Sequence, residues 1–349
     1  MGWISSCWPA APDRTSPCEP TGWSCWPRLD QRSDHRRRQP IDPFPLLETG
    51  NGEDGGEEPE VNTSKLSPTE LDRHATKLKE EGYTIIPEVL SPADLEEARR
   101  AIDETLEAEA STALKYGLQN ENLLMCYNAQ GKHPHFPGML TRHPEPLLVA
   151  RRVLGDDMFA HNLAIRKPLP TGKKDWTKLG GYLHADWHHF TVNPFIGGRH
   201  YPLAVQSVWC VSEFTRQNGA TYVWPRSHLS LEVPPEQPQT LPEGWIRAEA
   251  PAGSAILWDS ALWHTSGANC GTAPRYSLVF YFQRWWVRGF NDAYRLCPPE
   301  ARARMTEEER RIWGLEAAVP PNTHFRGMTP QQIEALTPEE KAVLNIAAF

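Results

Sequence analysis

The segments HADWHHF (184–190) and WHTSGANCGTAPRYSLVFYF (263–282) contain the residues on which the fold prediction depends. His184 and Asp186 are two residues apart, so on a β-strand both side chains point to the same face. His264 is distant in sequence and precedes a run typical of a strand, 276–282. If the two segments form neighbouring strands, these three side chains meet at one place.

Two histidines and one carboxylate form a ligand set typical of Fe(II) in non-haem oxygenases. Bound to one face of an octahedral ion, they leave the other positions open for a cosubstrate and dioxygen. Arg275 follows in the second segment and can offer a planar pair of N–H donors to a distal carboxylate. We therefore predict that His184, Asp186 and His264 are metal ligands and, with Arg275, catalytic. An Fe(II)- and 2-oxoglutarate-dependent oxygenase is the leading hypothesis.

The composition limits the classes of protein to be considered. The chain has 349 residues, enough for one large domain or two small ones, and a formal net charge of −8. It contains no long basic run, so we expect no nucleic-acid partner. No stretch approaches the ~20 apolar residues needed to cross a membrane, so we expect no membrane partner. A small-molecule substrate is the expected partner, and the sequence does not indicate an oligomeric state.

The seven cysteines are scattered and none forms a CxxC pair, which argues against a structural zinc site. We interpret them as thiols of a protein made for a reducing compartment and expect a cytoplasmic location. Organellar targeting by the N-terminal segment is the alternative.

Residues 1–65 differ in composition from the rest of the chain. They show no helical or strand period and end near the acidic, glycine-rich run TGNGEDGGEEPE (49–60). Such a segment buries too little apolar surface to offset its ordering entropy. We predict a disordered extension at 1–65 and a dioxygenase domain at 66–349, of which 298–349 is a helical C-terminal part.

The pattern of elements favours a mainly β domain with flanking helices. Ser67, Pro68 and Glu70 predict a helix start, Gly82 its end, and 83–86 a strand; Ser91 opens a second helix. Proline- and glycine-rich turns then separate runs expected to be strands, at 158–166, 180–190, 203–212, 221–225, 254–259 and 276–282. Helices are predicted again at 298–313, 329–336 and 337–344. Many short strands predict a double-stranded β-helix, that is, a jelly-roll, cupin-like core.

Several ordered blocks resemble the phytanoyl-CoA dioxygenase family of Fe(II)/2-oxoglutarate oxygenases. They are GYTIIPEVLS (82–91), KPLPTGKK (167–174), HADWHHF (184–190), QNGATYVWPRSH (217–228) and HTSGAN (264–269), followed by Arg275. The likeness runs from about Leu66 to about Trp286. One departure is Arg226, which stands where the family's loop usually carries glycine.

The resemblance implies roles for individual residues. His184, Asp186 and His264 look like the iron ligands, and Arg275 looks like the partner of the 2-oxoglutarate C5 carboxylate. Trp209 and Ser266 match residues that line the cosubstrate pocket. The family has a lysine that helps to hold 2-oxoglutarate, and Lys167, with Lys173 as a second candidate, lies near the matching position in this sequence.

The function implied by this likeness is hydroxylation or desaturation of an aliphatic carbon of a small organic metabolite, for example in secondary metabolism. Fe(II) is the expected cofactor, with 2-oxoglutarate and O2 as cosubstrates. Asp186 argues against halogenation, because halogenating relatives have a small residue there. The alternatives are hydroxylation of an acyl-CoA thioester, a cupin-like metalloenzyme that does not use 2-oxoglutarate, and a binding module without catalysis.

Overall fold

The computed structural model describes residues 64–116, 122–173, 175, 179–186, 195–196, 199–230, 232, 234–235, 243–287, 292–315 and 335–343. All of them belong to one compact unit, Glu58–Phe349. The extension predicted at 1–65 lies outside the described residues except for its last two, and so does most of the helix predicted at 329–336. Within the described ranges, no helix combines the length and apolar character needed to cross a membrane.

Helix α1, Pro68–Glu81, begins and ends where the sequence predicts. The Ser67 side chain accepts a hydrogen bond from the Glu70 backbone N–H, and the Glu70 carboxylate accepts one from the Ser67 N–H. The helix ends at Gly82, whose φ of 84° lies in the left-handed region that favours glycine. A Cβ at Gly82 would also lie 2.5 Å from the Nδ1 of His228, so a side chain is excluded there for two reasons.

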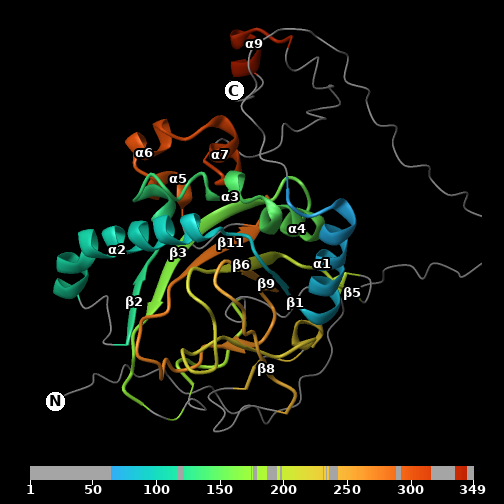
Figure 1. Ribbon diagram of the computed structural model, residues 1–349. Helices are drawn as coiled ribbons and strands as arrows, with labels where there is room; N and C mark the ends of the chain where they lie inside the picture. The colour runs from blue at the N-terminus through green and yellow to red at the C-terminus, as the bar shows by residue number, and fades with distance from the viewer. Residues whose placement is uncertain are drawn as a thin grey trace, which may run out of the picture. The chain divides into compact units, whose positions relative to one another are not determined.

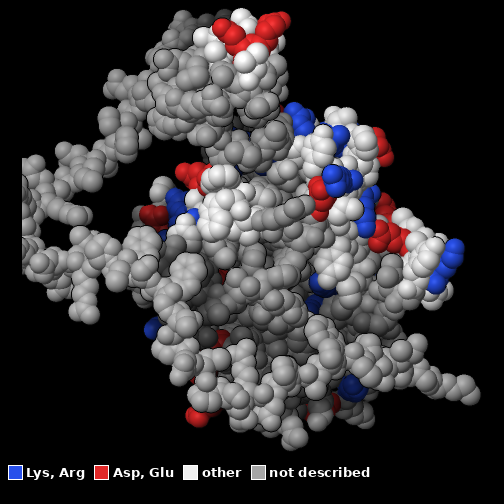
Figure 2. Space-filling model, turned by 180° about the vertical axis from the view of Figure 1, so that it is seen from behind, with Lys and Arg blue, Asp and Glu red and all other residues white. Residues whose placement is uncertain are grey.

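The helices that follow cover one side of the sheet (Figure 1). Helix α2, Pro92–Lys115, starts at the predicted cap Ser91 and buries Ala98, Ile102 and Leu106. Helices α3, Met139–Arg142, and α4, Glu145–Leu154, were not predicted. On the face shown in Figure 2, acidic and basic side chains of the described residues lie side by side.

The large sheet has six strands in the order β1-β9-β6-β11-β3-β2, and each neighbouring pair is antiparallel. The strands are β1 Tyr83–Ile86, β2 Leu123–Cys126, β3 Phe159–Pro168, β6 Ala204–Cys210, β9 Ala255–Asp259 and β11 Ser277–Gln283. Apart from β2 and β3, neighbours in this sheet are not consecutive in sequence. Helices or strands of the smaller sheets lie between each strand of this sheet and the next, so the chain leaves the sheet after every strand.

The smaller sheet receives part of the chain between those strands. It pairs β10, His264–Thr265, with β7, Tyr222–Val223, and β7 with β8, Ile246–Arg247. Single bridges join Leu179 to Gly267 and His184 to His264 at its edge. Strands β4, Phe195–Ile196, and β5, Arg199–His200, form a separate pair. The two sheets form the predicted jelly-roll core, with helices flanking it.

Two apolar clusters lie on the two faces of the large sheet. The outer cluster joins the helices to side chains such as Trp209 and Phe280. The inner cluster joins Val208 and Val279 of the large sheet to Val223 of the smaller sheet and to Ala248, which follows β8. Because side chains alternate along a strand, the register of each strand decides which residues can face the space between the sheets.

Two expectations about local structure were wrong. The strand predicted at 180–190 is, in its described part, a single bridge at His184 followed by a turn at Asp186; residues 187–190 lie outside the described ranges. The helix predicted at 298–313 is two helices, α6 Pro299–Ala303 and α7 Glu307–Ile312. A new capping box between Thr306 and Glu309 starts the second one. Short helices α5, Ala293–Leu296, and α9, Pro338–Val343, complete the described C-terminal part.

Candidate active site

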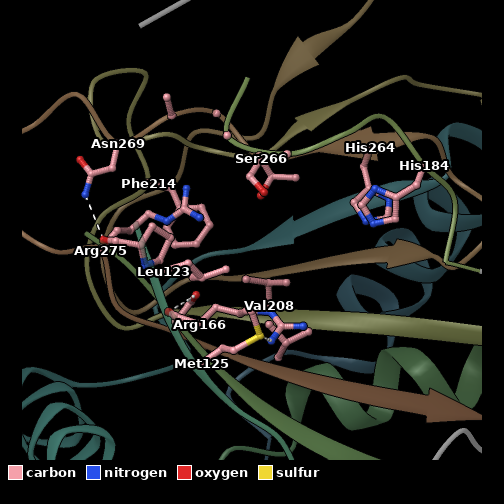
Figure 3. Close-up of a pocket in the computed structure, with 18 of the residues that line it drawn as sticks. Leu123, Met125, Arg166, His184, Val208, Phe214, His264, Ser266, Asn269 and Arg275 are labelled. Atoms are coloured by element: carbon pink, nitrogen blue, oxygen red, sulfur yellow. Dashed lines mark hydrogen bonds between the residues drawn. The ribbon is translucent and has the colours of Figure 1, made fainter. Parts of the chain in front are cut away.

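A cavity of about 440 Å³ opens between the two sheets. One wall comes from β2, β3, β6 and β11 of the large sheet, and the other from the segments around His184 and His264. Figure 3 shows His184 and His264 at one end of this cavity, Arg275 and Asn269 at the other, and Ser266 between them. The cavity therefore contains all four residues predicted to be catalytic, because Asp186 also lines it.

His184, Asp186 and His264 converge as a group that could hold a metal ion. One ligand atom from each lies within 4.8 Å of the other two. The Nε2 atom of His184 is 3.7 Å from Asp186 Oδ1, and that of His264 is 3.5 Å from Asp186 Oδ2. The bridge between the two histidines sets their spacing, and a backbone bond from the Asp186 N–H to the Ser260 carbonyl (2.9 Å) places the turn.

In both histidines the Nδ1 atom is hydrogen-bonded to a backbone carbonyl, so Nε2 is the nitrogen that can bind a metal. His184 Nδ1 lies 3.0 Å from the Tyr182 carbonyl, and His264 Nδ1 lies 2.9 Å from the Leu262 carbonyl. A carbonyl oxygen can only accept, so each Nδ1 carries the proton and each Nε2 presents its lone pair toward Asp186. Backbone partners of this kind orient metal-ligating histidines in proteins. The donor set therefore fits Fe(II).

Arg275 presents a buried charge that lacks a carboxylate partner among the described residues. Its backbone N–H donates to the Pro168 carbonyl (3.0 Å), and its guanidinium lies 4.2 Å from the centre of the Phe214 ring. One Nη donates to the Gly219 carbonyl, whereas Nε is buried without a hydrogen-bond partner. Burial lowers the pKa of Arg275 to about 10, so it remains charged at neutral pH. A buried, uncompensated guanidinium with an unused donor fits the carboxylate of a ligand.

The loop before Arg275 is held by Asn269. Its Nδ2 donates to the carbonyls of Pro168 (3.1 Å) and Ala273 (2.9 Å), and its Oδ1 accepts from the Gly271 N–H (3.0 Å). Gly267 of the same block lies against Gly219, and a Cβ on Gly267 would be 2.9 Å from the Gly219 Cα. This contact explains why two of the quoted sequence blocks carry glycine at these positions.

The residues predicted to bind the cosubstrate do not all reach the cavity. Ser266 lines the cavity. Trp209 does not: it is fully buried on the outer face, with its ring centroid 4.5 Å from that of Phe280. The assignment of Trp209 to the cosubstrate pocket is therefore corrected, because its neighbour Val208 takes the inward position on β6.

Lys167 is corrected for the same reason. Its Nζ donates to Asp103 on α2 at 2.7 Å and lies over the Tyr276 ring, outside the cavity. Lys173 is exposed and does not line the cavity either. Arg166, one residue before Lys167 on β3, faces the cavity instead. The sequence analysis did not single out Arg166. Adjacent side chains on a strand point to opposite faces, so a one-residue difference decides whether Arg166 or Lys167 faces the cavity.

Arg226 and His228 belong to a loop tied to the end of α1. Arg226 has a φ of 67°, the left-handed conformation in which glycine is favoured. Its N–H donates to the Glu81 carbonyl at 2.9 Å, and His228 Nε2 donates to the Lys79 carbonyl at 3.0 Å. Neither residue lines the cavity, so the strained backbone at Arg226 lies in a loop outside the site.

The chain is also similar to known proteins. The family model "Phytanoyl-CoA dioxygenase (PhyH)" matches residues 78–277, which include His184, Asp186, His264 and Arg275. "Dioxygenase af480" of Aspergillus fumigatus is 25% identical over 245 residues, covering 68% of this chain and 75% of that protein. "Dioxygenase trt7" of Aspergillus terreus is 26% identical over 213 residues, covering 59% and 71%. The crystal structure of EctD from S. alaskensis with 2-oxoglutarate and 5-hydroxyectoine is 20% identical, with a TM-score of 0.47, covering 64% and 80%.

Proposed function

Because the chain belongs to the phytanoyl-CoA dioxygenase family, as its sequence blocks predicted, we propose that it hydroxylates an aliphatic carbon of a small organic metabolite. The protein is an Fe(II)- and 2-oxoglutarate-dependent dioxygenase. His184, Asp186 and His264 hold the iron, and Arg275 holds the distal carboxylate of 2-oxoglutarate.

One observation supports these roles. The three candidate metal ligands and the guanidinium of Arg275, which lacks a carboxylate partner among the described residues, line the same cavity. The Nε2 atoms of His184 and His264 face the Asp186 carboxylate, and the Nε of Arg275 has no hydrogen-bond partner. A metal would occupy the first group, and a carboxylate would satisfy the second. 2-Oxoglutarate offers both a metal-chelating end and a distal carboxylate, so it suits a cavity with this polarity.

When bound, Fe(II) would activate dioxygen, the oxidant, for attack on a C–H bond, and 2-oxoglutarate would supply two electrons as it is converted to succinate and carbon dioxide. The protein supplies ligation, orientation and exclusion of water. The Nδ1 bonds to the Tyr182 and Leu262 carbonyls keep both imidazoles in one orientation, and Arg275 fixes the cosubstrate by its far end. Asp186 occupies a ligand position that halogenation requires to be open, which favours oxygenation.

The cavity wall supports a small or medium substrate of partly apolar character. Leu123, Met125, Val208 and Val279 line it, and its volume is about 440 Å³. The net charge of −8 disfavours a polyanionic coenzyme A ester. These features favour a free metabolite over an acyl-CoA thioester.

The test is incubation of the full-length protein with Fe(II), 2-oxoglutarate and a metabolite extract under isotopically labelled dioxygen. We expect a product that gains one labelled oxygen atom, formed together with succinate, and neither with the His264→Ala variant. A product that loses hydrogen without gaining oxygen would show desaturation. Turnover confined to added acyl-CoA thioesters would contradict the proposed substrate class.

A further inference from the structure

Arg166 brings a second guanidinium to the cavity. It lies on β3, where it pairs with Ser277 of β11 and Met125 of β2. All three residues line the cavity, whereas Lys167 points to the other face. Figure 3 shows the Arg166 side chain beside Met125 and Val208, on the wall formed by the large sheet. The position is therefore part of the reaction chamber and apart from the end occupied by Arg275.

The partners of the Arg166 guanidinium are uncharged. One Nη donates to the Met125 sulfur at 3.3 Å, and the other donates to the Tyr127 hydroxyl at 2.6 Å. The guanidinium carbon lies 4.5 Å from the centre of the Tyr127 ring. Burial raises the pKa of the nearby Tyr281 phenol to about 12, so Tyr281 stays neutral as well. No carboxylate of the described residues forms an ion pair with Arg166.

The charges around the cavity leave Arg166 without compensation. The charged side chains among the described lining residues are Arg166, Asp186 and Arg275. Asp186 and Arg275 carry opposite charges, and Fe(II) and 2-oxoglutarate also cancel when both are bound. With both bound, the charges of the described lining residues therefore sum to one positive charge, which belongs to Arg166. The Arg166 guanidinium is half-buried and its hydrogen-bond partners are neutral, so the carboxylate of a ligand would add a counter-charge that the described residues do not supply.

We propose that Arg166 binds a carboxylate of the prime substrate, so that the enzyme acts on carboxylic acids with an apolar skeleton. A guanidinium offers the planar pair of donors that a carboxylate accepts. Leu123, Met125 and Val208 supply the neighbouring apolar wall. This inference rests on the proposed function and makes it more specific, because it names the group by which the substrate is recognised.

The test compares octanoate with octanamide, which has nearly the same shape but no charge. Each is titrated calorimetrically into the full-length protein loaded anaerobically with Fe(II) and 2-oxoglutarate. We expect octanoate to bind about 10–100-fold more tightly, the range of a charge-assisted pair in a partly buried site. Arg166→Met should abolish the preference and leave octanamide binding unchanged. Lys167→Met, the same change on the opposite face, should keep the wild-type preference.

Several outcomes would overturn the inference. One is equal binding of octanoate and octanamide by the wild type, or no binding of either. Another is that Arg166→Met weakens 2-oxoglutarate binding as strongly as octanoate binding, which would assign Arg166 to the cosubstrate. If Arg166→Met does not fold, Arg166→Gln replaces it. Failure of wild-type protein to bind 2-oxoglutarate would contradict the proposed function. The octanoate and octanamide titrations on protein loaded with Fe(II) alone would then still decide the role of Arg166.

Discussion

The inner and outer faces of the six-stranded sheet are formed by the same strands, yet their side chains have different surroundings. On the outer face, Trp209 and Phe280 pack into an apolar cluster with the helices. On the inner face, Arg166 and Tyr281 project into a cavity with polar and charged walls. Adjacent residues, such as Arg166 and Lys167, therefore belong to different environments. The contrast predicts that outer-face substitutions change stability, whereas inner-face substitutions change ligand binding.

The largest effect is expected from Trp209→Ala on the outer face. Removing this fully buried side chain should lower the free energy of unfolding by about 3–5 kcal/mol, because a cavity remains in the apolar cluster. Chemical denaturation measures the loss. The folded fraction should bind 2-oxoglutarate like the wild type. A Trp209→Phe variant that keeps its stability but loses 2-oxoglutarate affinity would contradict the separation of the two faces.

On the inner side, Arg275→Met should act on the ligand. Loss of the buried guanidinium should weaken 2-oxoglutarate binding by about 100-fold or more, because the distal carboxylate would be buried without its counter-charge. The free energy of unfolding should not fall in parallel, since no carboxylate of the described residues depends on Arg275. Spectroscopic titration of the iron-loaded variant measures affinity. Unchanged 2-oxoglutarate affinity would remove the role assigned to Arg275.

A loop outside both faces should respond only in stability. Arg226 adopts a φ of 67°, so Arg226→Gly should relieve strain and raise the free energy of unfolding by up to about 1 kcal/mol. Its contact with Glu81, at 3.5 Å, is exposed and contributes little. Thermal unfolding checks the direction of the change. A fall in stability would show that the Glu81 contact outweighs the backbone strain.

The smallest effect is expected from Lys167→Met. The ion pair between Lys167 and Asp103 is partly exposed, so its loss should cost less than about 1 kcal/mol. Affinity for 2-oxoglutarate should stay within about twofold of the wild type, because the side chain lies outside the cavity. A marked loss of affinity for 2-oxoglutarate would show that Lys167 lies in the cosubstrate pocket and that the register of β3 is wrong.

Local signals in the sequence were sufficient for some elements. Ser67, Pro68, Glu70 and Gly82 predicted both ends of α1, because capping and a left-handed terminus depend on neighbouring residues only. The meeting of His184, Asp186 and His264 was also predicted, although Asp186 lies in a turn and not on a strand. The need for three side chains to meet at one metal ion constrains their positions more than the secondary structure of each residue does.

Other features depend on contacts that a sequence pattern does not contain. Trp209 and Lys167 were placed in the cosubstrate pocket by resemblance, but the face of each side chain depends on strand register. Strand β2 was missed because it pairs with β3, about forty residues further along the chain. The cytoplasmic location and the extension at 1–65 stay predictions.

We propose that His184, Asp186 and His264 hold iron in a cavity where Arg275 receives 2-oxoglutarate. Anaerobic titration of the Fe(II)-loaded protein with 2-oxoglutarate, followed by visible absorption, tests both roles at once. Chelation through the open positions should produce a weak charge-transfer band near ~500 nm in the wild type. The band should vanish in His264→Ala and should need much more 2-oxoglutarate in Arg275→Met. Iron binding without any band in the wild type would contradict the claim.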